Sequence, residues 1–208
     1  GVGLTLLVTV GALVLSTVLG LVWAILRVSG IGLLSGLSAT LVNVIRGIPI
    51  IVQLFYLYFV MPDLGVSLTA LQAAIIGLGV AYSAYQAENF RAGIQAIDKG
   101  QIEAAECLGL NKLQIYWHIV LIPAVERVYP ALSSQFVLLM LASSITSQIS
   151  AEELTAVANY IQSDTYRAFE TYSIVARLCI SLSLVMRAGF WGLGLVLFPR
   201  RRRLGTPL

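Results

Sequence analysis

The residues with the clearest functional pattern occupy positions 97–123, which read IDKGQIEAAECLGLNKLQIYWHIVLIP. Asp98 is a suitable N-cap, Gln101 follows at the spacing of a capping box, and Gly109 suits the left-handed turn that ends many helices. These signals predict a short polar helix over residues 99–108. At about 1.5 Å per residue, this helix would be roughly 15 Å long.

The chemistry available to this helix is noncovalent recognition. Ala104 and Ala105 give it a small cross-section and little side-chain entropy, so the cleft of another protein can close around it. Glu103 and Glu106 add charge that can steer such docking. The alternative is an amphipathic helix lying on a bilayer surface, which would need Lys, Arg and bulky apolar residues on opposite faces. The acids and alanines favour docking to a soluble partner.

Ionisable residues inside apolar segments form a second candidate site. Because burying such groups in lipid is costly, each of them is a functional hypothesis. Glu88 and Arg91 are three positions apart and can pair on one helix face, and Arg46 stands at an interruption of its segment. Structural or gating roles are therefore predicted for Arg46, Gly47, Pro49 and Arg91.

A lining for a solute path is predicted from polar side chains in the same segments. The candidates are Tyr82, Tyr85, Glu88, Gln135, Ser143 and Ser144. Their hydroxyl, amide and carboxylate groups can contact a polar solute. The alternative for the hydroxyls and amides is bonding between neighbouring helices, and for the tyrosines it is packing. No metal site is predicted, because Cys107 and Cys179 stand in segments of different character.

The composition indicates that membrane-spanning helices position these residues. Hydrophobic residues make up 58% of the 208-residue chain, charged residues make up 11%, and the mean hydropathy is +0.89. These values are typical of a polytopic membrane protein and exclude a soluble enzyme of this length. The net charge of +3 does not indicate nucleic acid binding, since the basic residues lie in loops without interleaved aromatic residues. We predict a single transmembrane domain over residues 1–208.

Five segments approach the roughly 20 apolar residues that a spanning helix needs. They cover residues 4–26, 33–60, 68–90, 125–147 and 172–198. The second is expected to be kinked, because Pro49 removes a backbone donor and restricts the residue before it. The predicted fold class is therefore an all-α polytopic membrane protein with five transmembrane helices. The short polar helix lies between the third and the fourth.

Positive charge orients these segments, since Lys and Arg in short loops stay in the cytoplasm. One side of the predicted membrane carries Arg27, Arg91, Lys99, Lys112, Arg200, Arg201, Arg202 and Arg203. The loops around residues 61–67 and 150–171, on the other side, are acidic and carry only Arg167 as a basic residue. The predicted topology has the amino end outside, and the carboxyl end and the 99–108 helix in the cytoplasm.

Several strings in the sequence resemble one known family. Glu103-Ala104-Ala105, Gly109 and Ile122-Pro123 resemble the EAA loop in permease subunits of bacterial ATP-binding-cassette (ABC) importers. Residues 45–53, IRGIPIIVQ, and residues 84–94, AYQAENFRAGI, resemble the permeases for polar amino acids within that family. The similarity covers nearly the whole chain, and the order and spacing of the strings make it specific.

The resemblance implies a type I ABC importer permease fold in the cytoplasmic (inner) membrane. The coupling helix would then be seated in a separate ATPase subunit through Lys99, Gly100, Glu103, Ala104, Ala105, Leu108 and Gly109. That ATPase would bind ATP and magnesium, because this sequence contains no GxxxxGK(S/T) phosphate loop. Further implied partners are a second copy or a sister permease, and a solute-binding protein that is separate or fused upstream of Gly1. The chain itself would be non-catalytic and would move a polar amino acid by alternating access.

Other interpretations remain open at the solute site. Many relatives have Lys-Asp-Thr-Ser in the fourth span, whereas this chain reads Leu141-Ala142-Ser143-Ser144, which leaves its solute contacts undefined. A permease for another small organic solute would share the EAA loop. An ion-coupled secondary transporter is a further alternative, although it would usually show internal repeats, and none is evident in the sequence.

Overall fold

A computed structural model describes residues 1–198, so the predicted basic cluster Arg200 to Arg203 lies outside the described residues. Within this range every regular element is a helix, which confirms the all-α prediction. In chain order the elements are α1 (Val2–Val28), α2 (Gly32–Gly47), α3 (Ile50–Phe55), η1 (Tyr56–Val60), η2 (Met61–Leu64), α4 (Ala70–Gln95), α5 (Lys99–Cys107), α6 (Lys112–Gln114), η3 (Ile115–Leu121), α7 (Ile122–Ala142), η4 (Ser143–Ile149), α8 (Leu154–Thr165) and α9 (Ala168–Leu197). The segments η1 and η3 are π-helical, and η2 and η4 are 3₁₀-helical.

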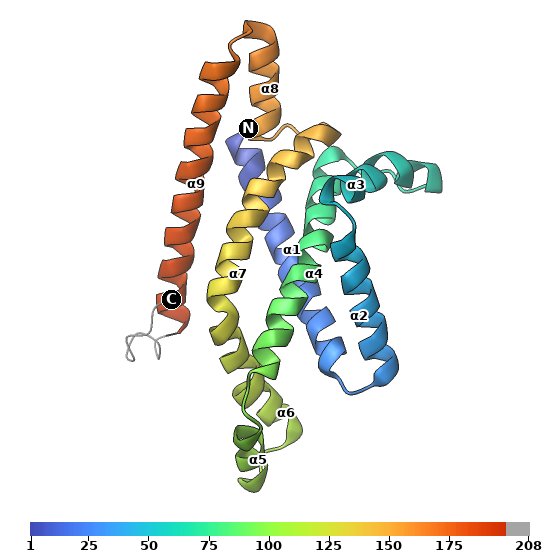
Figure 1. The fold of residues 1–208 in the computed structure, drawn as a ribbon, viewed down its shortest axis with the longest axis vertical. Coiled ribbons are helices and arrows are strands. Elements are labelled where there is room, and N and C mark those ends of the chain that lie inside the picture. The colour runs from blue at the N-terminus through green and yellow to red at the C-terminus, as the bar shows by residue number, and fades with distance from the viewer. Residues whose placement is uncertain (199–208) are drawn as a thin grey trace.

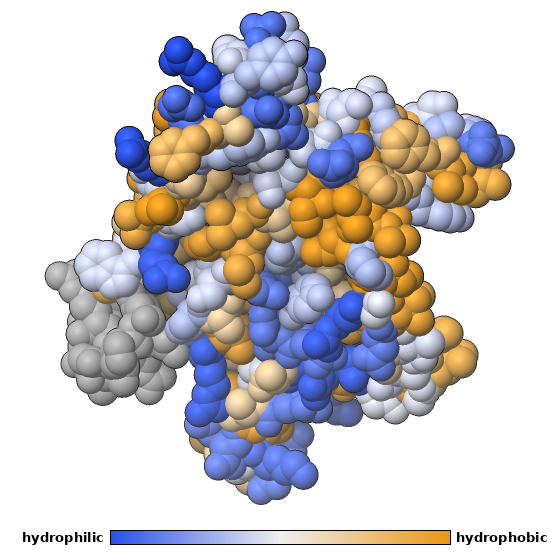
Figure 2. Space-filling model, turned by 45° about the horizontal axis from the view of Figure 1, so that its top comes forward, coloured by the Kyte–Doolittle hydropathy of each residue, from blue (hydrophilic) through white to orange (hydrophobic). Residues whose placement is uncertain are grey.

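Helix α4 packs against α1, α2 and α7, which makes it the central helix of the molecule (Figure 1). Helices α5 and α6 project from one end, while α3 and α8 lie at the opposite end, and α9 runs alongside α7. Figure 2 shows a broad hydrophobic area across the upper middle of the molecule and hydrophilic side chains over the lower end, where α5 and α6 lie. An apolar middle with a polar end suits helices that cross a bilayer.

Small residues let α1 and α4 approach each other closely. A Cβ atom added to Gly20 would lie 2.5 Å from the Gln86 Cβ, and one added to Gly79 would lie 2.6 Å from the Leu15 Cδ2. Ala12 of α1 is also fully buried. Because lipid is as apolar as the side chains, membrane helices associate mainly through such close packing. The glycines therefore fix how α1 lies on α4.

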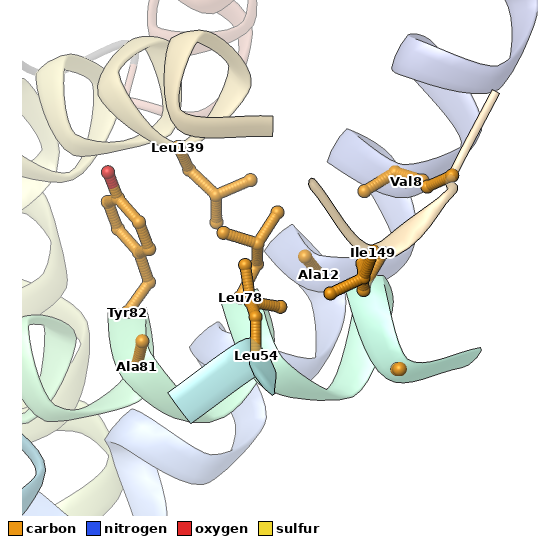
Figure 3. Close-up of a cluster of buried hydrophobic side chains, with 11 residues drawn as sticks. Val8, Ala12, Leu54, Leu78, Ala81, Tyr82, Leu139 and Ile149 are labelled. Carbon is orange, nitrogen blue, oxygen red and sulfur yellow. The ribbon is translucent and has the colours of Figure 1, made fainter. Parts of the chain in front are cut away.

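An apolar core joins the ends of several helices near α3. Leu54, Leu78, Leu139 and Ile149 are fully buried in it, with Val8 beside them (Figure 3). These five side chains come from α3, α4, α7, η4 and α1 respectively. The core therefore connects elements that are far apart in the sequence, at the end of the bundle opposite to α5.

The segment predicted as one kinked span over residues 33–60 is broken rather than kinked. Helix α2 and the arm formed by α3, η1 and η2 meet at 99°. Ile48 and Pro49 between them have extended backbone, as the restriction before a proline predicts. The Gln53 Nε2 group donates hydrogen bonds to the carbonyls of Ile45 and Ile48, both at 2.9 Å. These bonds satisfy oxygens that the break leaves without helical partners.

Fewer described helices are long and apolar enough to cross a membrane than the five that the sequence predicts. Three described helical segments pass this test, namely Val2–Val28, Lys112–Ile149 and Ala168–Leu197, and the bent pair makes a fourth if it counts as one span. The predicted span 125–147 thus lies inside a longer helical segment. Helix α4, predicted as the span 68–90, is not among the segments that pass, and other helices bury many of its residues. The five-span count therefore stays a prediction.

Helix α8 lies where the sequence predicts only a loop. Its N-cap is Glu153, whose Oε1 accepts a hydrogen bond of 2.9 Å from the Ala156 N–H. Burial raises the pKa of the Glu153 carboxyl, while the backbone donors at the helix start oppose the shift. The Leu154 N–H donates to the Thr5 Oγ1 at 3.0 Å. This bond fastens α8 to the start of α1.

Replacing Gly20 with alanine is expected to lower the free energy of unfolding by about 1–3 kcal/mol, because the added methyl group would overlap the Gln86 Cβ. Gly36→Ala in α2 is the matched control, since no atom lies within 4 Å of its added Cβ and alanine is the better helix former. The measurement is the thermal unfolding midpoint of the detergent-purified chain. Equal midpoints for the two variants would contradict the tight α1–α4 contact.

Candidate functional site: helix α5 and the charged residues of α4

Helix α5 forms where the sequence predicts it and ends one residue earlier than the predicted 99–108 helix. The Asp98 Oδ1 accepts a hydrogen bond of 2.7 Å from the Gly100 N–H, which confirms Asp98 as the N-cap. Gln101 forms no reciprocal bond within residues 1–198, so the predicted capping box is incomplete. Gly109 has a φ of 77°, and the left-handed turn predicted there is confirmed.

Most of the residues predicted to dock a partner are exposed on α5 or just after it. These are Lys99, Gly100, Glu103, Ala104, Leu108 and Gly109. Ala105 is the exception, with 3% of its surface exposed, and α5 packs against η3. Leu108 and Leu113 expose 81% and 77% of their surfaces. A small helix with short side chains, followed by exposed leucines just after it and in α6, is suited to being enclosed by another protein.

The base of the α5 loop is fastened to the two long helices that flank it. A guanidinium N–H of Arg127 on α7 donates to the carbonyl of Ala96, just after α4. A Cβ added to Gly93 of α4 would lie 2.8 Å from the Ala124 carbonyl oxygen of α7. Arg127 is absent from the residues that the sequence singles out, although its charge at the edge of the predicted span 125–147 is a signal. Helix α5 is therefore held by a close junction of α4 and α7.

One carboxylate on α4 binds two guanidinium groups. The Glu88 Oε2 accepts hydrogen bonds from the Nε and Nη2 of Arg91 at 2.9 and 2.7 Å, which confirms the pairing that their spacing predicts. The Glu88 Oε1 accepts from Arg27 at the end of α1. No local pattern predicts this second contact, since it joins residues 61 positions apart. The side chains are 20–28% exposed, so these pairs are less screened by solvent than surface pairs.

Arg46 stacks on Tyr85, a neighbour of Glu88 on α4. Its Cζ lies 5.3 Å from the centroid of the Tyr85 ring, within the range of cation–π attraction. The Tyr85 and Tyr82 ring centroids are 5.9 Å apart. Tyr82 is 7% exposed and belongs to the apolar core that contains Leu139 (Figure 3). The two tyrosines therefore differ in their surroundings: Tyr82 is packed among apolar groups, and Tyr85 is half-buried beside a charge.

The predicted solute residues near the end of α7 are engaged within their own helix. The hydroxyls of Ser143 and Ser144 donate to main-chain carbonyls three residues earlier, at 2.7 and 2.8 Å. Ser143 is almost fully buried, whereas Ser144 and Gln135 are half-buried. These bonds use the hydroxyl donors and leave the oxygen lone pairs available as acceptors.

A groove of about 620 Å³ lies between α7 and α9. Its polar lining consists of Tyr129, Ser133, Ser134, Arg187 and Trp191. None of the six residues predicted to line the solute path contributes to this groove.

Comparison with known proteins assigns the chain to a family. Residues 16–197 match the family described as "Binding-protein-dependent transport system inner membrane component". The chain belongs to this family. The predicted resemblance to ABC importer permeases is thereby confirmed, and the chain has the role of such a permease.

Two curated relatives of this permease have names consistent with that role. The "Probable glutamine ABC transporter permease protein GlnM" of Bacillus subtilis is 37% identical over 185 residues, which cover 89% of this chain and 86% of that protein. The "Probable amino-acid ABC transporter permease protein y4tG" of Sinorhizobium fredii is 36% identical over 171 residues, which cover 82% of this chain and 74% of that protein.

Solved structures support the permease fold. A chain in the crystal structure of an amino acid ABC transporter with histidines aligns with a TM-score of 0.84 at 35% sequence identity, covering 97% of this permease and 92% of that chain. A chain of the inward-facing MetNI methionine ABC transporter aligns with a TM-score of 0.75 at 21% identity, covering 94% and 91%. The second likeness concerns the fold alone. Together they confirm the predicted type I ABC importer permease fold.

Replacing Glu88 with glutamine is expected to lower the permease's free energy of unfolding by roughly 2–3 kcal/mol, because Arg27 and Arg91 would lose their counter-charge while partly buried. Glu152→Gln removes an exposed carboxylate elsewhere and is expected to change it by less than about 0.5 kcal/mol. Thermal unfolding in detergent measures both. Combining Glu88→Gln with Arg27→Gln should cost less than the sum of the two single changes, and simple additivity would contradict their direct pairing.

Proposed function

We propose that this permease imports a polar amino acid, driven by a separate ATPase into which helix α5 docks. The observation that carries the proposal is an exposed, capped α5 held at the junction of α4 and α7 through Arg127. The names of the relatives, which refer to glutamine and to amino acids in general, support the solute class.

The proposed contact with the ATPase uses the exposed side of α5. It consists of Lys99, Gly100, Glu103, Ala104, Leu108 and Gly109, while Ala105 packs α5 onto the permease. The missing side chain at Gly100 and the short one at Ala104 allow a cleft to close around the helix. Leu108 offers an apolar anchor of the kind that stabilises protein interfaces.

Coupling follows from the way α5 is attached. ATP and magnesium are proposed to bind to the ATPase, whose closure carries each α5 with it. Because Arg127 binds the Ala96 carbonyl, a displacement of α5 passes to both α4 and α7 and is not absorbed in a loose loop. The permease performs no covalent chemistry. It alternates between inward-open and outward-open states whose populations ATP shifts.

The proposed topology places the α5 end in the cytoplasm, and α8 and the amino end outside the inner membrane. Helix α4 and the bent pair then act as spans together with the three most apolar segments. Helix α9 is exposed along most of its length, so it offers apolar surface to lipid and to a second copy or a sister permease. A solute-binding protein, separate or fused, is proposed to dock at the end that carries α8.

The proposed lining of the solute path keeps the six predicted residues, Tyr82, Tyr85, Glu88, Gln135, Ser143 and Ser144. Tyr85 has the strongest support, because its ring is half-buried beside the Arg46 charge. Gln135 and Ser144 are partly exposed and can offer oxygen acceptors to an ammonium group. The buried Tyr82 and Ser143 and the paired Glu88 would support this lining rather than contact solute.

Replacing Ala104 with arginine is expected to abolish uptake and to weaken ATPase copurification by about tenfold or more, because a long charged side chain would prevent closure of the cleft. Membrane insertion should be unchanged. Ser163→Arg places the same side chain on an exposed position of α8, at the opposite end, and should leave copurification unaffected. Normal uptake by the Ala104→Arg permease would refute docking at α5.

A further inference from the structure

The geometry around Arg46 points to a binding site for the carboxylate of the transported amino acid. In this inference, which rests on the proposed function, the Arg46 guanidinium donates hydrogen bonds to the α-carboxylate of the solute. Tyr85 supports the guanidinium from its other face. The position of Arg46 in the sequence predicts only a structural or gating role at the helix break, and the structure gives a reason to go further.

The break between α2 and α3 does not use the Arg46 side chain. Pro49 and the extended Ile48 interrupt the helix. The Gln53 side chain binds the carbonyls of Ile45 and Ile48, which the break would otherwise leave without partners. An arginine is therefore not required to form or hold the bend, and its presence calls for another explanation.

Arg46 also lacks the ion pair that its neighbours have, and only a longer-range attraction links it to Glu88. The two carboxylate oxygens of Glu88 already accept hydrogen bonds from Arg27 and Arg91. No ion pair joins Arg46 to a carboxylate within residues 1–198. Three guanidinium groups and one carboxylate sum to a charge of +2, that is, three positive charges less one negative charge. This excess of positive charge attracts an anion.

Arg46 stands where a charge is tolerated only beside water or an anion. It lies near the end of α2, within the predicted span 33–60, and it is exposed. A guanidinium that faced lipid tails would be costly, so such residues face an aqueous path or a partner charge. The Tyr85 ring, 5.3 Å away, covers one face of the guanidinium. The N–H groups at the edge of a stacked guanidinium can still bind a carboxylate through two parallel hydrogen bonds.

An amino acid supplies the group that this arrangement fits. Its α-carboxylate is planar and negatively charged, and it is common to all amino acids. Arg46 would therefore recognise the invariant part of the solute. Selection among amino acid side chains would be left to other residues of the path or to the solute-binding protein.

The test measures direct binding to the purified complex of this permease with its ATPase, without nucleotide or solute-binding protein. The twenty L-amino acids are tried as radiolabelled probes, and the tightest binder is compared with its α-carboxamide, which lacks the negative charge. The wild-type complex should bind the carboxamide about tenfold more weakly than the acid. The Arg46→Gln complex should bind the acid about tenfold more weakly than wild type does and should show no preference over the carboxamide.

Two control variants make the result specific. Arg187→Gln removes an exposed arginine of α9 and should leave both affinities unchanged. Arg46→Lys keeps the charge without the two-pronged geometry and should retain part of the preference for the acid. If the Arg46→Gln variant fails to assemble with the ATPase, the Arg46→Lys variant takes its place. A preference for the acid over the carboxamide as strong as in wild type would then count against the inference.

The two proposals fail in different ways. An Arg46→Gln complex that prefers the acid as strongly as wild type would overturn the inference and leave the amino acid importer in place. A wild-type complex that binds none of the twenty amino acids would overturn the proposed solute class, and the carboxylate site with it.

Discussion

The close contact between α1 and α4 is the constraint on which the rest of this permease depends. Gly20 and Gly79 remove side chains where the two helices come nearest, so α1 lies directly on the α4 backbone. Helices α2, α3 and α7 pack on the other sides of α4. Helix α4 is thereby shielded from lipid, and it can carry polar groups that would be costly on an exposed span.

That shielding explains why the functional contacts gather along one helix. Ala96, just past its end, binds Arg127 at the base of the α5 loop, Glu88 binds two arginines, and Tyr85 supports Arg46. The interval from Ala96 to Tyr85 is about 16 Å at 1.5 Å per residue. A short, rigid stretch of α4 therefore connects the docking helix with the charged cluster and with the proposed carboxylate site.

The sequence predicts the features that local chemistry determines. Asp98 and Gly109 delimit α5, and Pro49 interrupts the second span, because caps and prolines act on their immediate neighbours. Contacts such as Arg27 with Glu88 depend on the tertiary fold, and no local pattern encodes them. The sequence does not predict helix α8, because its N-cap, Glu153, is one of several acidic residues that are equally typical of a loop. The acids and alanines of α5 indicate docking to a soluble partner, whereas only the family resemblance identifies that partner as an ATPase and the solute as a polar amino acid.

The right angle between α2 and the arm of α3, η1 and η2 has a mechanical consequence. The Gln53 side chain binds the Ile45 carbonyl of α2, so the two pieces form a braced corner. Because the corner is held at a fixed angle, a tilt of one piece moves the other piece sideways. A small tilt of α2 inside the bilayer would therefore displace the arm sideways at the end of the molecule opposite to α5.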